Sequence, residues 1–441
     1  MFGSSDDVIL IGGDKSFQWQ HVFWVLPSIA ATTLILWFLA SWHHLHHIPG
    51  PFFASISNFQ RAWWVMTGDS HLHHQRMHAK YGSVVRLVPN MVSISDPEAT
   101  PTIYPMRPDF IKSDFYAALR AYTPNRGTML AVFNTQDEDM HKWIKNPIAP
   151  LFTLSRTISL ERTVDGVLGC LAHQLDTRFS PNREVLELGD WLQFFAFDVM
   201  GTMTFSRRYG FLDEGQDVQG RIATIFNYMK AAAPMTQIPW LDRCINKNRV
   251  VHIFRHTPGM SIMGFIGEVV GERLKRDRSQ HCTTNAAKSD YAPKDFLDHY
   301  LEIQRTNLEV PDWAPLAWVF SNVLAGSDSV GTTTRTVIDH LLANPTSLER
   351  LREELLTANV SLPRPQWAEV SGLPFLDACI QEGLRLYPPF ALPLERIVPP
   401  GGITILGKYI PEGTIVGGNP YVVNRYEPVF GHDAEQWRPE R

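Results

Sequence analysis

The segment CIQEGLRLYPPFALPLERIVPP contains a glutamate and an arginine, Glu382 and Arg385, three positions apart. On a helix, side chains at positions i and i+3 lie on the same face and can form a pair. The planar guanidinium of arginine can bind a carboxylate through two hydrogen bonds, and it keeps its charge when buried. Pro388 and Pro389 then end the helix. The spacing predicts an ion pair that is either an ordinary surface pair or the anchor of a buried charged cluster.

A second candidate site interrupts a long apolar helix, which is predicted over residues 311–342. Its middle carries the run Ala325-Gly326-Ser327-Asp328-Ser329. A glycine in a helix interior costs about 1 kcal/mol relative to alanine. A buried aspartate costs more unless it is paired. The two together indicate a functional site; the alternative is a glycine that lets helices pack closely beside a solvent-facing aspartate.

Composition excludes several classes of function. The formal net charge is −5 and no Lys/Arg run resembles a basic arm, so no nucleic-acid partner is expected. The chain has four cysteines, none in a C-x-x-C pair and none with zinc-type spacing to histidine. No metal site built from these cysteines is therefore expected, and their scatter indicates a reducing compartment. They are Cys170, Cys244, Cys282 and Cys379.

The elements that must position these residues are mostly helical. Alternating Val and Ile residues predict a hairpin within Tyr81–Ala99, and Pro and Gly clusters separate short apolar runs in a second β-rich patch, Leu392–Gly418. The polar run over residues 280–294 lacks periodicity and predicts a loop. The sequence therefore predicts a mainly α fold with two small β-sheets, and its further helices cover about 160–178, 191–207, 220–233 and 259–278.

The N-terminal part predicts a membrane anchor. Residues Val22 to Trp42 carry no charge, and a helix of this length can cross a bilayer. A cleaved signal peptide is the alternative, but the apolar stretch is longer than such peptides require. Ile48-Pro49-Gly50-Pro51 then predicts a stiff turn. We therefore expect a tail and anchor over 1–48, with the helix at about 22–42, and a main domain over 49–441.

These features occur in one order: an anchor, a Pro-Gly-Pro turn, a hairpin, A-G-S-D-S on a central helix, E-x-x-R before Y-P-P, and finally P-E-R. In this order the chain resembles a microsomal cytochrome P-450, a heme-thiolate monooxygenase. The stretch FAFDVMGTMTFSRRYGFL, over 195–212, resembles the pisatin-demethylase-like branch of filamentous fungi. The resemblance implies the cytochrome P-450 fold.

The resemblance also implies roles for the two candidate sites. Glu382, Arg385 and the arginine of P-E-R, Arg441, would form a charged triad beneath the heme. Gly326 would let the central helix open over the iron. Asp328 and Ser329 would stand in place of the acid–alcohol pair that delivers protons to iron-bound dioxygen.

Cofactor, substrate and partners follow from the same resemblance. Heme propionates would be bound by the cations His141, Lys145 and Arg396. An NADPH–cytochrome reductase would supply electrons, and the enzyme would oxidise a small apolar molecule in fungal secondary metabolism. The protein would be a single-pass endoplasmic reticulum membrane protein with a luminal tail and a cytosolic main domain. The substrate pocket would include Phe115, Tyr116, Phe320, Phe390 and Leu392.

One departure from the family pattern concerns the metal ligand. The family places its axial cysteine in a loop of the type F-x-x-G-x-R-x-C-x-G, and no cysteine follows Cys379 in this sequence. The thiolate of that loop pushes electron density onto the iron and favours O–O cleavage. We therefore expect a cytochrome P-450 fold that is incomplete at its C-terminus. Three interpretations stay open: a monooxygenase, a truncated and inactive remnant, and a membrane-anchored binding protein without catalysis.

Overall fold

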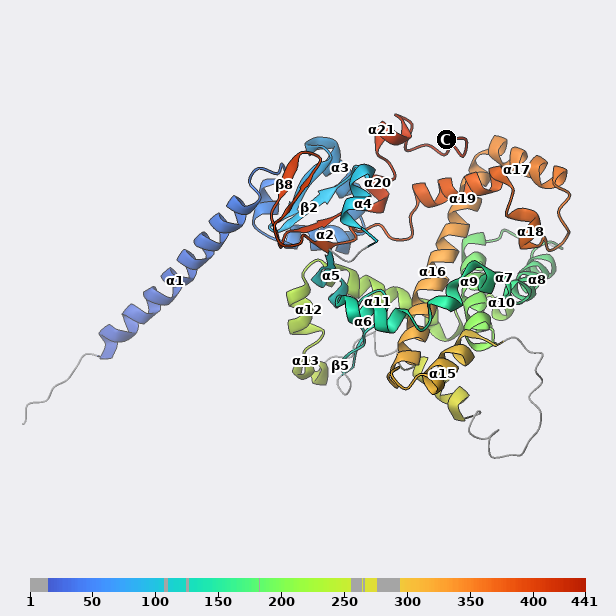
Figure 1. Cartoon of the computed structure of the whole chain (residues 1–441), viewed down its shortest axis with the longest axis horizontal. Helices are drawn as coiled ribbons and strands as arrows, with labels where there is room; N and C mark the ends of the chain where they lie inside the picture. Colours follow the sequence, from blue (N-terminus) through green and yellow to red (C-terminus); the bar gives the residue numbers. More distant parts are fainter. Residues whose placement is uncertain are drawn as a thin grey trace, which may run out of the picture.

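A long N-terminal helix and a small sheet lie on one side of a larger helical bundle (Figure 1). The computed structural model describes residues 15–106, 110–123, 127–181, 183–254, 264, 266–275 and 294–441. Its first elements are α1 (Lys15–His44), η1 (Phe52–Ser55), α2 (Phe59–Thr67), α3 (Ser70–Tyr81), η2 (Pro97–Ala99) and α4 (Thr100–Ile103).

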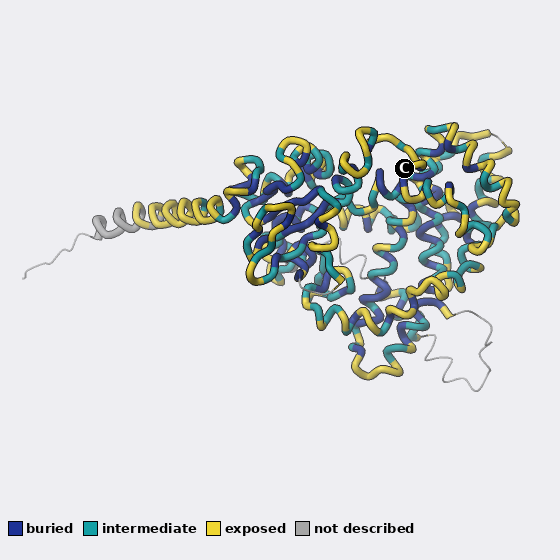
Figure 2. Tube along the Cα trace, turned by 45° about the horizontal axis from the view of Figure 1, so that its top comes forward, coloured by how far each residue is buried: buried dark blue, intermediate teal, exposed yellow. Residues whose placement is uncertain are grey.

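Helix α1 extends away from the rest of the chain, and its described residues from Trp24 onward are mostly exposed (Figure 2). The exposed apolar side chains include Trp24, Leu34 and Trp42. Within the described ranges, no helix is both long and apolar enough to cross a membrane. The membrane-spanning helix expected over residues 22–42 is therefore not supported. Pro27, Ser28, Thr32 and Thr33 dilute the apolar character of this stretch.

The two predicted β-rich patches join in one sheet. The hairpin β1–β2 continues through β9, β6 and β3 in a five-stranded sheet of order β1-β2-β9-β6-β3. Strand β9 pairs in parallel with β2, which fuses two segments that the sequence predicted as separate sheets. The strands are β1 (Val84–Val88), β2 (Met91–Ile94), β3 (Ile111–Lys112), β6 (Arg396–Ile397) and β9 (Ile415–Gly417). Two further two-stranded sheets pair β4 (Tyr122–Thr123) with β5 (Gly127–Thr128) and β7 (Ile403–Ile405) with β8 (Lys408–Ile410).

Most of the predicted helices are present, with boundaries shifted by a few residues. The helices before residue 255 are α5 (Asp114–Ala118), α6 (Glu138–Lys145), η3 (Ala149–Phe152), α7 (Leu154–Ile158), α8 (Glu161–Arg178), α9 (Leu188–Phe205), α10 (Phe211–Glu214), η4 (Val218–Gly220), α11 (Arg221–Thr236), α12 (Pro239–Ile245) and α13 (Arg249–Phe254). Those after residue 293 are α15 (Phe296–Thr306), α16 (Ala314–Ala343), α17 (Pro345–Thr357), α18 (Trp367–Val370), α19 (Pro374–Leu386), α20 (Pro420–Val423) and α21 (Glu427–Phe430). Part of the helix predicted over 259–278, and nearly all of the loop predicted over 280–294, lie outside the described residues.

The central helix α16 organises the largest hydrophobic core. It packs along α9, and it buries Trp318, Phe320 and Val323 among side chains of α8, α9 and α15. Trp318 is fully enclosed and donates its indole N–H to the carbonyl of Ile144 at 3.0 Å. This bond ties α16 to the end of α6, so the central helix and the segment that carries His141 and Lys145 are fixed relative to each other.

Helix α3 contacts the sheet through a buried histidine. His78 donates its Nδ1–H to the carbonyl of Gly82 at 2.9 Å, and its Nε2 lies 2.8 Å from the hydroxyl of Ser93 on β2. Burial lowers the pKa of His78 to about 4, although the hydrogen bond to Gly82 opposes the shift. The native state therefore holds His78 neutral at a pH where an unfolded chain would protonate it.

This histidine makes the fold sensitive to acid. In the unfolded chain His78 titrates near pH 6.5, so its penalty is absent above that pH and grows as the pH falls towards 4. We expect His78 to cost about 2–3 kcal/mol of unfolding free energy by pH 4.5. Urea denaturation at pH 7.5 and 4.5 measures this loss of unfolding free energy. The unfolding free energy of His78→Gln should show much less pH dependence than that of the wild type. The control His432→Gln, at a fully exposed side chain, should keep the wild-type pH dependence. Equal pH dependence in the wild type and His78→Gln would contradict this assignment.

Candidate active site

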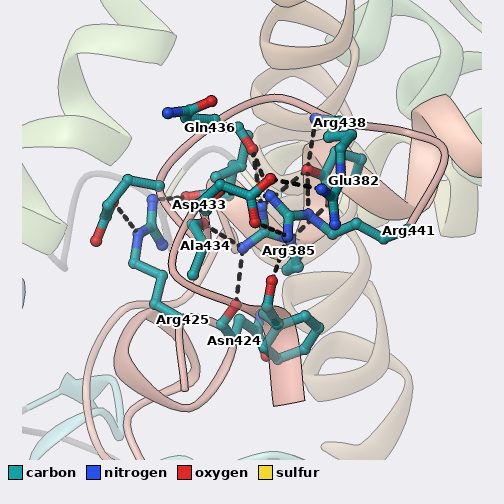
Figure 3. Close-up of polar contacts among 12 residues, drawn as sticks. Glu382, Arg385, Asn424, Arg425, Asp433, Ala434, Gln436, Arg438 and Arg441 are labelled. Carbon is teal, nitrogen blue, oxygen red and sulfur yellow. Dashed lines mark hydrogen bonds and ion pairs between the residues drawn. The ribbon is translucent and has the colours of Figure 1, made fainter. Parts of the chain in front are cut away.

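A buried charged cluster surrounds the end of helix α19 (Figure 3). Arg385 donates from Nε and Nη2 to the two carboxylate oxygens of Glu382, at 2.7 and 2.8 Å. Its Nη1 donates to the backbone carbonyls of Ala434 and Asn424, at 2.6 and 2.9 Å. The side chains of Glu382 and Arg385 are 4% and 7% exposed. The pair is therefore a buried bidentate anchor, and the alternative of a surface pair is excluded.

Arg441 completes this cluster. Its Nε lies 3.2 Å from the Oε1 of Glu382, and its Nη1 lies 3.0 Å from the Oδ1 of Asp433. The backbone N–H of Arg438 also donates to Glu382, at 2.8 Å. Burial acts to raise the pKa of the Glu382 carboxyl, but its hydrogen bonds from Arg385, Arg438 and Arg441 prevail and hold that pKa below its usual value. The structure thus brings the three residues of the predicted triad together.

A second cluster consists of cations at the edge of the five-stranded sheet. Strands β3 and β6 are antiparallel, and their register places Lys112 directly opposite Arg396. Lys112 donates its ammonium to the carbonyls of Phe133 and Val132 at 2.9 and 3.2 Å. Arg396 donates to the hydroxyl of Tyr116 at 2.8 Å. Like charges facing each other across two strands are unfavourable, so an additional anion would stabilise this arrangement.

The electrostatics of this cation cluster point the same way. Burial, followed by the charge of Arg396, lowers the pKa of Lys112 to about 8. Burial, followed by the charge of Lys112, also lowers the pKa of His141, while Glu138 at 3.6 Å partly opposes this. In the described part of the chain, neither Lys112 nor Arg396 has a carboxylate within ion-pair distance. Lys145, which is exposed at the end of α6, acts on both Lys112 and His141 through its charge.

The carboxylate arms of a heme fit this cation cluster. Lys112, His141, Lys145 and Arg396 would hold the propionates, and three of these four residues are those predicted from the sequence. Lys112 was missed. Its position in the apolar run Phe110-Ile111-Lys112 was the available signal, because a lysine is rarely buried without a partner.

The described cysteines do not provide the thiolate that the family uses. Cys379 is fully buried among apolar side chains of α16, α17 and α19, and burial raises the pKa of its thiol to about 11. Burial also raises the pKa of Cys170, which contacts Arg208 and Asp213. Cys244 is exposed on α12. None of these three thiols contacts the cation cluster, and Cys282 lies outside the described residues.

Aromatic side chains form an apolar wall next to the cation cluster. Phe115 and Tyr116 on α5 contact each other edge to face, with ring centres 5.2 Å apart. Phe390 lies 6.2 Å from Phe115, and Phe133 lies 5.3 Å from Tyr116 and 6.1 Å from Phe390. The structure thus gathers Phe115, Tyr116 and Phe390 as predicted and adds Phe133, which is 47% exposed and can contact a ligand.

Two predicted pocket residues do not join this aromatic wall. Phe320 is 4% exposed and packs in the large helical core, because it lies on the buried face of α16. Leu392 is half-buried in the segment between α19 and β6. Their roles as pocket residues stay predictions.

The interrupted run on α16 packs against α9 on one side. A Cβ on Gly326 would lie 2.7 Å from the Cε of Met200, so the glycine allows the two helices to approach closely. Asp328 is exposed and accepts a hydrogen bond from the side-chain amide of Gln193 at 3.2 Å. Ser329 donates its hydroxyl to the carbonyl of Ala325 at 2.7 Å. The expectation of a buried aspartate is therefore wrong, because Asp328 faces solvent, and Gly326 lies at a close contact between two helices as the alternative expected. The helix is continuous through the glycine, and the role of Gly326 above the iron stays a prediction.

Comparisons with known proteins agree with this geometry. The family model of cytochrome P-450 matches residues 48–441. The chain is 54% identical over 424 residues to cytochrome P-450 monooxygenase mfmA of Annulohypoxylon moriforme, covering 95% of this chain and 82% of that protein. It is 48% identical over 419 residues to cytochrome P-450 monooxygenase pkfB of Emericella nidulans, covering 95% and 81%. It is also 49% identical over 403 residues to cytochrome P-450 monooxygenase mpaDE of Penicillium roqueforti, covering 90% of this chain and 46% of that protein. The chain belongs to the cytochrome P-450 family.

Proposed function

We propose that this chain forms the main domain of a heme-dependent monooxygenase that hydroxylates a small, largely apolar molecule. The observation that carries the proposal is the pairing of the cation cluster with the aromatic wall. Tyr116 belongs to both, because its hydroxyl accepts from Arg396 while its ring contacts Phe115 and Phe133. A cofactor held by its carboxylates would therefore lie next to these aromatic side chains, of which Phe133 is exposed and Phe390 half-buried, so both could contact a substrate. The family implies a reductase that passes electrons from NADPH.

Residues of α16 would hold protons and pass them on during the reaction. When bound, the heme supplies the activation of dioxygen. The hydroxyl of Ser329 can hold a proton and pass it on, because its hydrogen bond to Ala325 is local and exchangeable. The neighbouring carboxylate of Asp328 is exposed and can exchange protons with solvent. The side-chain amide of Gln193 donates to this carboxylate and orients it. Both groups sit one helical turn or less from Gly326.

The substrate is a secondary metabolite of a fungus, by analogy with the fungal sources of the relatives. The pisatin-demethylase-like branch remains a prediction from residues 195–212. The chain works at the endoplasmic reticulum membrane, with its main domain in the cytosol. This is supported by α1, which exposes Trp24, Leu34, Trp37 and Trp42 to an extent that suits a lipid interface. Sedimentation of the full chain with microsomes tests the location, and recovery in the supernatant would contradict it.

The activity is tested with the full chain loaded with heme, mixed with a fungal NADPH–cytochrome reductase and a panel of aromatic and terpenoid compounds. Isotopically labelled dioxygen should appear as one labelled oxygen atom per product molecule, and product should require NADPH. Heme-loaded protein that leaves every compound unlabelled would favour the inactive remnant. A well-folded chain that takes up no heme would favour the binding protein.

A further inference from the structure

A small cationic cavity lies beside helix α5, which also carries Phe115 and Tyr116 of the aromatic wall. Its volume is about 300 Å³, and its lining comes from α5, the segment around Gln136, strand β5 and helix α12. Helix α12 packs directly against α5. The basic residues in the lining are Arg120, Arg243 and Lys247, and the one described carboxylate is Asp242.

Arg120 is the unusual member of this lining. It is half-buried and donates from Nε to the carbonyl of Asn134 at 3.2 Å and from Nη2 to the side-chain oxygen of Gln136 at 2.9 Å. Both acceptors are neutral. Within the described residues, no carboxylate lies within ion-pair distance of its guanidinium, and its Nη1 has no hydrogen bond. This guanidinium is therefore partly desolvated, and its direct hydrogen-bond partners are neutral.

The other described charges of the cavity form ion pairs that do not include Arg120. The carboxylate of Asp242 is buried and pairs with the ammonium of Lys247, which also donates to the carbonyl of Ala117 at 2.5 Å. Arg243 pairs with Asp114 at 2.5 Å on the exposed side, where its side chain is 57% exposed. Burial lowers the pKa of Arg120; the charge of Asp114, the next largest influence, opposes this, and the charge of Arg243 adds to the lowering. Burial lowers the pKa of Lys247, and the charges of Arg120 and Arg243 add to the lowering. The bond to Asp242 opposes this shift.

Helix α5 links this cavity to the proposed substrate site. Phe115 and Tyr116 lie in the aromatic wall, whereas the next two residues, Ala117 and Ala118, line the cavity. Gln136 bridges the two regions, because its side-chain amide donates to the carbonyl of Lys112 at 3.3 Å and to the carboxylate of Asp114 at 3.1 Å. The lining of the cavity therefore begins one residue after Tyr116, and a molecule that contacts the exposed ring of Phe133 would lie near it.

We propose that this cavity is an anion subsite for the substrate, and that the substrate carries a carboxylate which Arg120 binds, with Arg243 and Lys247 adding positive charge. This inference rests on the proposed function, which it deepens by naming an organic acid as the substrate class. A carboxylate suits the site better than a free inorganic anion because Ala117, Ala118 and Pro239 supply apolar surface beside the cations. The planar fork of Arg120 can bind both oxygens of such a group.

Direct binding tests the subsite without requiring turnover or reductase. Isothermal titration of the full chain would compare 2-naphthoate with its neutral amide, 2-naphthamide. We expect the acid to bind about 10- to 100-fold more tightly than the amide. Arg120→Gln should remove most of this preference, and Arg120→Lys should retain part of it. The matched control Arg207→Gln, at an arginine that is 78% exposed and outside the cavity, should leave the preference unchanged.

Three outcomes would overturn the proposal. They are equal binding of the acid and the amide, an undiminished preference in Arg120→Gln, and displacement of 2-naphthoate by an equal concentration of inorganic phosphate. If Arg120→Gln fails to fold, Arg243→Gln on the exposed side of the cavity should lower the preference instead, and no change there would equally overturn it. Failure of oxygen incorporation alone would count against the proposed function and not against the subsite, since the binding experiment involves no oxidation.

Discussion

Replacing Arg385 with alanine is expected to lower the free energy of unfolding by about 3–5 kcal/mol. The reason is the loss of compensation for a buried charge. Glu382 is 4% exposed, and two of its hydrogen bonds come from Arg385, at 2.7 and 2.8 Å. The variant would also leave the carbonyls of Ala434 and Asn424 without their guanidinium donor. Urea denaturation of the wild type and the variant at pH 7.5 measures the difference.

Two further variants separate this explanation from a general sensitivity of the region. Arg438→Ala removes an ion pair to Asp433 whose arginine side chain is 50% exposed, so its effect should stay within about 1 kcal/mol. The double variant Glu382→Met with Arg385→Leu should cost less than Arg385→Ala alone, because no unpaired buried charge remains. Equal effects of Arg385→Ala and Arg438→Ala would show that the buried pair does not stabilise the fold as described.

The same pair sets a lower pH limit for the fold. Because the pKa of Glu382 is lower in the folded chain than its usual 4.5, its contribution is fully present above about pH 4.5. That contribution is lost as the pH falls through the folded-state pKa. The acid sensitivity from Glu382 therefore begins where that from His78 is nearly complete.

Ser329→Ala is expected to lower the amount of product formed per NADPH consumed by about 100-fold. The substitution removes the hydroxyl that lies at the interruption of α16 and donates to Ala325. Without it, the site would lose a hydroxyl that can hold and pass on a proton, so we expect more of the NADPH consumed to appear as peroxide instead of product. The ratio of product to NADPH, with peroxide measured in parallel, gives the effect.

A matched control lies about one turn further along the same helix. Thr334 is half-buried, as Ser329 is, and donates its hydroxyl to the carbonyl of Val330 at 2.9 Å. This is the same local bond that Ser329 makes to Ala325. Thr334→Ala should therefore leave the ratio unchanged, and Ser329→Thr should preserve it because the hydroxyl remains. A Ser329→Ala variant with wild-type coupling would remove this serine from the proposed mechanism.

Features of the fold that depend on local sequence were predictable. The long apolar run of α16 and the i, i+3 spacing of Glu382 and Arg385 are properties of single helices, and the structure reproduces both. The union of the two β patches was not predictable, because it depends on β9 pairing with β2 across most of the chain. Strands of two to five residues carry too little pattern to fix such a partner.

Some residues of the candidate site were likewise predictable from the sequence, and others were not. Phe115 and Phe390 were named from the resemblance, and the structure places them together. Phe320 was named on the same grounds, but the face of a long central helix to which a residue belongs is decided by packing on several sides. Lys112 was missed because its significance comes from its cross-strand partner Arg396, and that register exists only in the folded sheet.

Titration of the purified full chain with hemin tests most directly the proposal that the cation cluster binds the carboxylates of a heme. We expect saturable binding of one hemin per chain, measured as a change in the absorbance of the hemin. The double variant Lys112→Leu with Arg396→Leu should weaken this binding about 10- to 100-fold, since the cluster would lose two of the four groups that would hold the propionates. The matched control Arg207→Gln should bind as the wild type does. Non-saturable binding, or equal affinity in the wild type and the double variant, would contradict the account.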